Sequence, residues 1–284
     1  MIRVHRGPEP AELVKVRAEK LKELRDIVAR EKRDPLSTEI KGYRVVAKAL
    51  WEAQHHKCCY CEQPLERCRN DVEHYRPKAQ ANRGTHHAAT HGYWWLAFTW
   101  ENLLFSCENC NQGKAKGVKF SLAAVGRTLV AEQSPNHYER PLLLDPAIEC
   151  GVEHIQFHLV PATRKWMPFA RQGSPKGYET IRTCLLDRND LLDLYTKHVN
   201  GEVRPEVKAV RAALVQADVV AIDQAVHRAH QKLLRRSKPF VGLSYDALQH
   251  FIPSSGIASW GCAWHAPTIA PLPIRGQKGK SLSR

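Results

Sequence analysis

Two pairs of cysteines with the same spacing constrain this chain more than any other feature of its sequence. Each pair has the form Cys-x-x-Cys, first at Cys58 and Cys61 and again at Cys107 and Cys110. One such pair can wrap two thiolates around a metal ion, and two pairs complete the tetrahedral shell that structural zinc prefers. Because 45 residues separate the pairs, the segment between them must fold as a module. We therefore predict a structural zinc site made of these four cysteines.

Five further cysteines show no comparable pairing, and we interpret them as packed or free thiols: Cys59, Cys68, Cys150, Cys184 and Cys262. Cys59 is a possible substitute ligand for Cys58, although Cys58 has the two-residue spacing to Cys61. The alternative to a metal site is two unrelated pairs of buried thiols. Disulfides are not expected, because the cytosol keeps thiols reduced and we predict a cytosolic protein.

The composition is that of an ordinary soluble globular protein. The 284 residues suffice for one large domain or two small ones, and 43% are hydrophobic and 25% charged. No apolar run approaches the roughly 20 residues needed to span a bilayer. Residues 1–10 are polar and lack the apolar segment of a signal peptide. These features predict a cytoplasmic protein without a membrane partner.

The chain is strongly basic. Its formal net charge is +14 and its isoelectric point is about 9.5. Such an excess attracts polyanions and favours nucleic acid as a partner, whereas the alternative is a solvated surface rich in lysine and arginine. The basic stretch at residues 275–284 could hold DNA through counterion release, or it could be idle.

The segment between the cysteine pairs carries a second pattern. After the first pair comes Asp-Val-Glu-His-Tyr-Arg-Pro-Lys at 71–78, then Glu-Asn-Leu-Leu at 101–104, and Asn-Gln-Gly-Lys at 111–114 directly follows Cys110. The order acidic-His-x-x-Pro, Asn-Leu and Cys-x-x-Cys-Asn-x-x-Lys resembles the HNH nuclease motif over residues 58–117. That resemblance implies a ββα-metal fold, which places these residues around one divalent ion.

The resemblance also implies a role for each residue of the motif. His74 is the candidate general base, since imidazole titrates near neutral pH and can take a proton from water. Glu73 and Asn111 are the candidate ligands of the catalytic ion, and their oxygens suit magnesium or manganese. Asn102 is expected to orient the base, and Lys114 either contacts phosphate or is a solvated surface group.

Two positions depart from the usual HNH pattern. Glu73 stands where Asp is more frequent, and its extra methylene changes its reach to the ion. Asn111 stands where His is often found, but its amide still offers an oxygen. The departure at Glu73 therefore puts its assignment as a ligand in doubt, whereas the departure at Asn111 does not put activity in doubt.

Several stretches resemble one branch of the HNH proteins. These are the nucleases encoded beside an ATPase in bacterial anti-phage systems, of the Septu PtuB type and the similar retron-associated type. The stretches are Cys-x-Tyr-Cys-Glu at 58–62, Glu-His-Tyr-Arg-Pro-Lys at 73–78, Pro-Leu-Leu-Leu-Asp-Pro at 141–146, Gly-Tyr-Glu-Thr-Ile at 177–181 and Leu-Asp-Arg at 186–188. The resemblance implies phage or plasmid DNA as substrate and an ATPase partner, which would dock on helices at 10–32 and 205–236.

Two other functions compete with this one. One is a nuclease of a restriction or mobile-element system that works without an ATPase. The other is a non-catalytic zinc-ribbon protein that binds nucleic acid or acts as an adaptor. We favour an enzyme because a binding module has no need for Glu73, His74 and Asn111 at this spacing.

The predicted fold class is α+β and mainly helical, with the nuclease module embedded between helical segments. We divide the chain into an N-terminal helical segment at 1–57, the zinc-clamped HNH module at 58–120, a mostly helical α/β region at 121–252 and an irregular basic tail at 253–284. Apolar periodicity predicts helices at 10–32, 38–54, 176–198 with a possible break near 187–190, 205–236 and 245–251. Short strands are expected at 141–144, 155–160 and 165–169.

Histidines and tryptophans around the motif are given ordinary roles. A cluster of histidines in a polar loop is usually solvated, although some could touch nucleic acid or metal: His55, His56, His86, His87 and His91. Trp94, Trp95 and Trp100 could stack on bases, but we favour packing against the zinc module.

Overall fold

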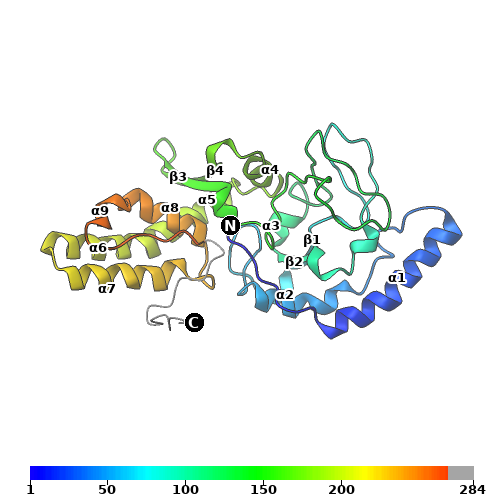
Figure 1. Ribbon diagram of the computed structural model, residues 1–284, viewed down its shortest axis with the longest axis horizontal. Coiled ribbons are helices and arrows are strands. Elements are labelled where there is room, and N and C mark those ends of the chain that lie inside the picture. The colour runs from blue at the N-terminus through cyan, green and yellow to red at the C-terminus, as the bar shows by residue number, and fades with distance from the viewer. Residues whose placement is uncertain (268–284) are drawn as a thin grey trace, which may run out of the picture.

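The structure is a computed structural model, and it describes residues 1–267. The predicted basic stretch at 275–284 lies outside the described residues. The longest N-terminal helix lies at one end of an elongated molecule, the C-terminal helices lie at the other, and the two small sheets lie between them (Figure 1). Neither this first helix nor any other helix within residues 1–267 is long and apolar enough to cross a membrane.

The first predicted helix is confirmed as α1 (Ala11–Glu31), which buries Leu13 and Leu24 and ends where Lys32 takes a left-handed conformation. The second, predicted for 38–54, is shorter than expected. It consists of the 3-10 turn η1 (Tyr43–Val46) and α2 (Ala47–Ala53). The helix cannot begin before residue 43, because Gly42 has a φ of 104°, which is incompatible with a right-handed helix. Val45 of η1 is 50% exposed.

The segment between the cysteine pairs contains the first sheet. Strand β1 (Asp71–His74) pairs antiparallel with β2 (Leu103–Ser106), and the short helix α3 (Glu108–Asn111) follows directly. All eight strand residues are buried, so this pair of strands is part of the core. Three 3-10 turns complete the segment: η2 (Arg67–Arg69), η3 (Trp94–Leu96) and η4 (Trp100–Asn102).

The second sheet confirms two of the three predicted strands. After the 3-10 turn η5 (Gly151–Glu153), strand β3 (Ile155–Val160) pairs antiparallel with β4 (Lys165–Ala170), and the 3-10 turn η6 (Arg171–Gly173) follows. The strand expected at 141–144 is wrong. Only an isolated pairing of Leu122 with Pro141 occurs there, and Pro141 has no N–H with which to extend a ladder.

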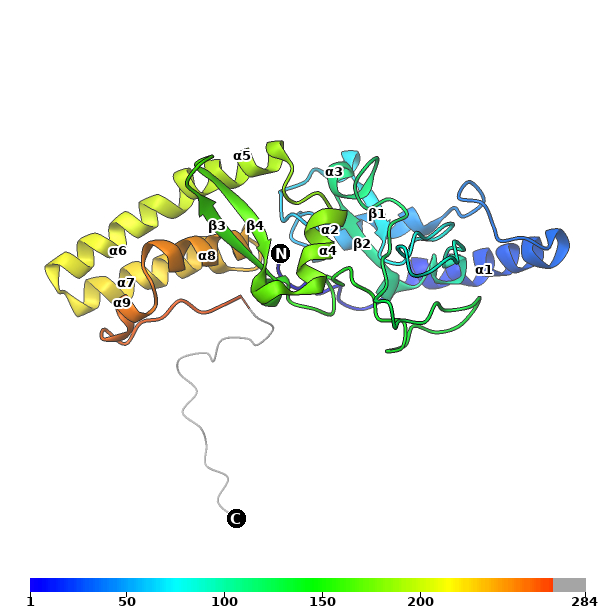
Figure 2. The same cartoon turned by 90° about the horizontal axis from the view of Figure 1, so that it is seen from above.

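The described chain after η6 is mostly helical, whereas residues 112–150 form turns and irregular loops. Its α-helices are α4 (Pro175–Thr183), α5 (Asn189–His198), α6 (Arg204–Gln216), α7 (Val219–Ala229), α8 (Val241–Phe251) and α9 (Ser255–Ala258). The π-helical turn η7 (Val199–Val203) joins α5 and α6 into one long rod (Figure 2), and a second π-helical turn, η8 (His230–Leu234), follows α7. The break expected near 187–190 is confirmed by the gap between α4 and α5.

The single helix predicted for 205–236 is wrong. The chain turns between α6 and α7, because Ala217 adopts a left-handed conformation with φ 53° and Asp218 caps the next helix by accepting from the N–H groups of Val220 and Ala221. The helix expected at 245–251 exists but starts earlier, at Val241. The region expected to be irregular from 253 contains α9 within its described part.

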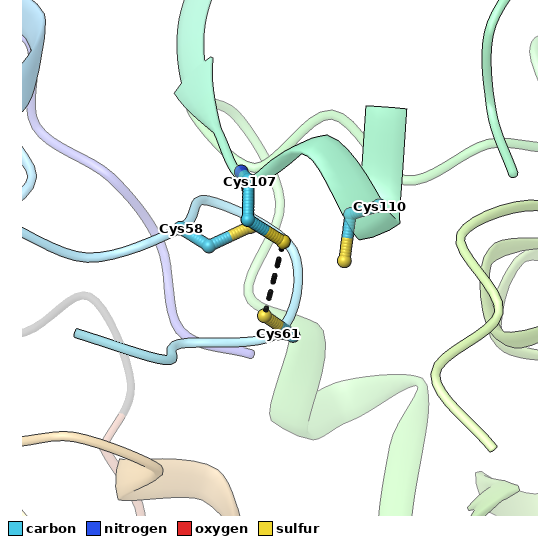
Figure 3. Close-up of side chains that lie close together, drawn as sticks. All are labelled: Cys58, Cys61, Cys107 and Cys110. Carbon is cyan, nitrogen blue, oxygen red and sulfur yellow. Dashed lines mark hydrogen bonds between the residues drawn. The ribbon is translucent and has the colours of Figure 1, made fainter. Parts of the chain in front are cut away.

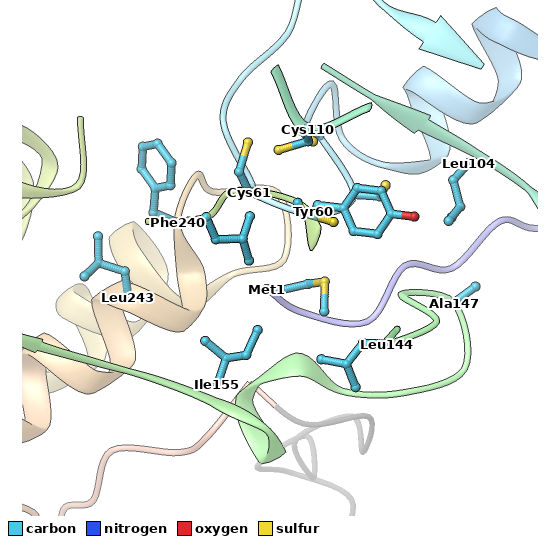
Figure 4. Close-up of a cluster of buried hydrophobic side chains, with 14 of the residues drawn as sticks. Met1, Tyr60, Cys61, Leu104, Cys110, Leu144, Ala147, Ile155, Phe240 and Leu243 are labelled. Carbon is cyan, nitrogen blue, oxygen red and sulfur yellow. The ribbon is translucent and has the colours of Figure 1, made fainter. Parts of the chain in front are cut away.

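One continuous core joins the segments on either side of the first sheet. Figure 4 shows part of it, where Tyr60 and Cys61 from the first cysteine turn meet Ile155 of β3 and Leu243 of α8. Trp94, Trp95 and Trp100 belong to the same cluster and are at most 6% exposed. The packing role expected for these tryptophans is therefore confirmed.

Candidate functional site

Four buried cysteines converge at the junction of the first sheet and α3. The sulfurs of Cys58, Cys61, Cys107 and Cys110 all lie within 4.8 Å of one another, and those of Cys61 and Cys107 are 3.8 Å apart (Figure 3). Four sulfurs at about 2.3 Å from a zinc ion would lie about 3.8 Å from each other. The donor set and its spacing therefore fit a zinc ion, and this group can hold a metal such as zinc.

The structure resolves the alternative among the neighbouring thiols. Cys58 belongs to the group of four cysteines that could hold a metal, whereas the adjacent Cys59 is buried outside it. Among the residues that the structure describes, no other group of three or more histidine, cysteine or acidic side chains is close enough to hold an ion.

An arginine from the C-terminal helices reaches the cysteine group. Arg188, which precedes α5, donates from its guanidinium to the Cys110 sulfur at 3.5 Å and to the Leu185 carbonyl at 3.1 Å. The backbone N–H of Cys107 donates to the sulfur of Cys58 at 3.4 Å. Four thiolates around one zinc ion carry a net negative charge, which these donors would partly offset.

The paired strands β1 and β2 link the cysteine group to the motif residues. Cys107 directly follows β2, and Cys110 precedes Asn111 within α3. Strand β1 pairs with β2 so that His74 lies opposite Leu103 and Asp71 opposite Ser106. A metal ion that held the cysteines together would therefore also fix α3 relative to β1.

His74 is buried at the end of β1. Its Nε2 lies 3.0 Å from the carbonyl oxygen of Ala97. Because a carbonyl oxygen only accepts hydrogen bonds, Nε2 carries the proton and Nδ1 keeps its lone pair. The ring of Tyr43 contacts the imidazole edge-on at 4.5 Å between centroids. Burial lowers the pKa of His74 to about 3, and Lys78 adds to this effect, so the imidazole is neutral at neutral pH.

Glu73 faces a partner that the sequence did not reveal. Its carboxylate pairs with the ammonium group of Lys116 and accepts from the hydroxyl of Tyr60 at 3.4 Å. Lys116 is fully buried and also donates to the carbonyl of His74 at 2.8 Å. Burial raises the pKa of Glu73, and the pairing with Lys116 offsets part of this rise. An ion at Glu73 would thus share its carboxylate with a lysine.

Asn102 connects the backbone just after His74 to the backbone just before Ala97. Its Oδ1 accepts from the N–H of Arg76 at 2.8 Å, and its Nδ2 donates to the carbonyls of Arg76 and Leu96 at 3.1 and 3.2 Å. Leu96 directly precedes Ala97, the partner of the imidazole. The side chain is 2% exposed, so these bonds have no competition from water.

The side chain of Asn111 forms a hydrogen bond with Asp71 and not with Glu73. The Nδ2 of Asn111 donates to the Asp71 carboxylate at 3.2 Å, and the Nε2 of Gln112 donates to the same oxygen at 2.6 Å. Arg44 donates to the other carboxylate oxygen at 3.1 Å. Asp71 forms part of the quoted motif, but nothing in its spacing assigned it a role.

A cleft of about 980 Å³ opens over these groups. Its lining includes His74, Glu73 and Asn111 from the motif, together with residues from the chain between α1 and η1. Lys78 is one of the cationic residues that line the cleft. Its ammonium group donates to the hydroxyl of Tyr43 at 2.7 Å. The segment outside the motif thus builds one wall of the cleft.

Lys114 lies outside the cleft, whereas His91 of the histidine-rich loop lines it. Lys114 is exposed and is not among the residues that line the cleft. His87 and His91 are half-buried and bond through Nε2 to the carbonyls of Ala123 and Leu129, at 3.0 and 2.8 Å. The solvated state expected for these two histidines is therefore wrong, because each one fixes the loop to a neighbouring segment.

The fold and the site together define a mixed α/β protein with two small antiparallel sheets and a buried four-cysteine group that can hold a metal ion. Its sequence is similar to the Septu protein PtuB of Bacillus mycoides (strain KBAB4), with 32% identity over 139 residues. The match covers 48% of this chain and 45% of the relative, so the chain spans less than half the length of the curated relative that it matches. This similarity confirms the resemblance to Septu PtuB-type proteins. No family model matches the chain, and no solved structure gives a significant match.

Proposed function

We propose that this protein is a metal-dependent HNH-type nuclease that cleaves DNA as part of a Septu-type anti-phage defence system. The observation that carries the proposal is the state of His74. Its imidazole is neutral, its Nε2–H is committed to Ala97, and its Nδ1 is left with a lone pair in a residue that lines the cleft. An unprotonated nitrogen at the cleft is one condition for a general base, whereas the lowered pKa makes His74 a weaker base than a free imidazole.

The order of elements supports the same assignment. Two antiparallel strands and a short helix carry Glu73, His74 and Asn111, as the resemblance to the HNH motif implies. The four-cysteine group lies at the junction of the second strand and the helix. The relative's name, Septu protein PtuB, supports the placement in anti-phage defence.

In this mechanism His74 takes a proton at Nδ1 from the water that attacks the phosphorus atom, and the bond between phosphorus and the leaving ester oxygen breaks. Asn102 holds the backbone of Arg76 and Leu96 so that the imidazole keeps its direction. Asn111 and Glu73 would hold a magnesium or manganese ion through oxygen atoms. When bound, such an ion neutralises charge on the phosphate and on the leaving oxygen.

The fit of these residues to the ion is uneven. Asn111 offers a carbonyl oxygen, because its Nδ2 is the atom turned to Asp71. Glu73 is already paired with Lys116. This pairing is the specific observation that favours the second candidate, a zinc-bearing protein that binds nucleic acid without cutting it.

An assay on supercoiled plasmid separates the two candidates. The zinc-loaded protein is incubated with plasmid in magnesium or manganese, and the control omits the divalent ion, since a chelator would also strip the cysteine group. Nicking or linearisation that depends on the added ion supports the nuclease. A mobility shift of intact plasmid under every condition, even with an ATPase encoded beside the protein, would support the binding module.

The ATPase partner belongs to the same proposal. Its candidate docking elements are α1 and the helices α6 and α7, which lie at opposite ends of the molecule (Figure 1). Copurification of the two proteins, with loss of binding when α1 or the α6–α7 pair is deleted, supports this arrangement. Retained binding in both deletions would contradict it.

A further inference from the structure

Asp71 gathers the hydrogen bonds of two neighbouring amides. Its Oδ2 accepts from Asn111 at 3.2 Å and from Gln112 at 2.6 Å, and its Oδ1 accepts from Arg44 at 3.1 Å. The Asp71 side chain is 13% exposed and lines the same cleft as His74. Both carboxylate oxygens are therefore occupied by protein donors.

The chemistry of these groups fixes the direction of the Asn111 amide. A carboxylate only accepts hydrogen bonds, whereas an amide has one donating and one accepting end. The NH₂ end of Asn111 must therefore face Asp71, and its Oδ1 is the end turned away from the carboxylate. Without Asp71, a rotation of 180° about the last side-chain bond would exchange nitrogen for oxygen.

We propose that Asp71 is a positioning residue that keeps the Oδ1 of Asn111 turned toward the divalent ion of the cleft. This inference rests on the proposed function, because it needs an ion at Asn111. Arg44, which belongs to η1, holds the other oxygen of Asp71 and so ties this orientation to the N-terminal segment. In this proposal Asp71 acts through Asn111, because its two oxygens accept from protein donors on three residues.

Manganese binding without nucleic acid tests the proposal directly. The free Mn²⁺ signal in electron paramagnetic resonance is followed as wild-type protein, loaded with zinc, is added. Asp71→Asn places an amide opposite an amide and lets Asn111 turn. Loss of such an outer partner typically weakens metal binding by about 10- to 100-fold, and we expect a weakening in this range at unchanged zinc content and thermal stability.

Exchange of the two residues is the sharper experiment. The double variant Asp71→Asn/Asn111→Asp restores a donating amide opposite a carboxylate and presents oxygen at position 111 in either rotation. We expect it to bind Mn²⁺ at least as tightly as the wild type. If Asp71→Asn alone did not fold, this double variant would still decide the question.

The outcomes are separable. Asp71→Asn that binds Mn²⁺ like the wild type overturns the positioning role, as does a folded exchange variant that binds weakly. In both cases the wild type still binds Mn²⁺, so the proposed ion site stands. A wild type that binds no Mn²⁺ overturns the ion site itself, and this inference with it.

Discussion

The imidazole of His74 donates from Nε2 to the carbonyl oxygen of Ala97 across 3.0 Å, and this bond leaves Nδ1 as the nitrogen with the lone pair. The strand β1 supplies His74, whereas Ala97 follows η3, whose Leu96 is bonded to Asn102. The orientation of the imidazole therefore depends on residues more than 20 positions away along the chain. Three of the following predictions test parts of this arrangement.

Acid should destabilise the wild type through His74. The pKa is about 3 in the folded state and near 6.5 in the unfolded chain. Between these values the unfolded state binds a proton that the folded state excludes, so the free energy of unfolding falls as the pH drops below 6.5 and is unaffected by this group above it. The loss reaches roughly 2 kcal/mol by about pH 5.

The comparison for this effect is His74→Gln, whose amide nitrogen reaches the position of Nε2 and keeps a donor for Ala97 but does not titrate. Urea unfolding of both proteins at about pH 7.5 and about pH 5 should show a steeper loss in the wild type. The acid sensitivity of the cysteine group is common to both and cancels. Equal losses would show that His74 is protonated in the folded state.

Asn102→Asp should be more destabilising than Asn102→Ala. The aspartate keeps the acceptor for the N–H of Arg76 but places an oxygen against the carbonyls of Arg76 and Leu96. Each buried polar group left without a partner costs about 1–3 kcal/mol. Urea unfolding at neutral pH measures the order of the two variants, and the reverse order would mean that the amide does not make these bonds.

Cys107→Ala should lose bound zinc, stability and nuclease activity together. Its sulfur lies in the four-cysteine group, and structural zinc contributes directly to the free energy of folding. Cys59→Ala is the matched control, because Cys59 is equally buried but lies outside the group. Zinc content by atomic absorption and thermal melting decide the matter. A Cys107→Ala protein that is well folded but inactive would show that zinc and fold are not coupled.

Lys116→Met should be strongly destabilising, because it leaves the buried carboxylate of Glu73 without its charged partner. Removal of one member of a buried ion pair costs about 3–5 kcal/mol. The double variant Glu73→Gln/Lys116→Met removes both charges and should recover part of that loss. Urea unfolding of the three proteins measures it, and a double variant less stable than Lys116→Met would argue against the pair.

The cysteine group was predictable because each of its two pairs is recognised from four consecutive residues of the sequence. The Cys-x-x-Cys spacing identifies the four cysteines of the group without knowledge of the fold, and the apolar periodicity of α1 needed no tertiary contact. Lys116 was not predictable, since its role depends on meeting Glu73 more than 40 residues earlier in the sequence. The roles of Asp71 and Arg44 were not predictable either, because they depend on contacts between residues that are distant in sequence. The turn between α6 and α7 was missed because Ala217 is an ordinary helix former that adopts a left-handed conformation here.

The measurement that tests the central claim most directly is plasmid cleavage by the wild type and by His74→Ala, both shown by metal analysis to carry zinc. With magnesium or manganese present, we expect the wild type to cut the plasmid and the folded variant to leave it intact, because the variant lacks the base. Cleavage by His74→Ala at the rate of the wild type would contradict the assignment of the base. Cleavage by neither protein, even with a neighbouring ATPase supplied, would contradict the nuclease itself.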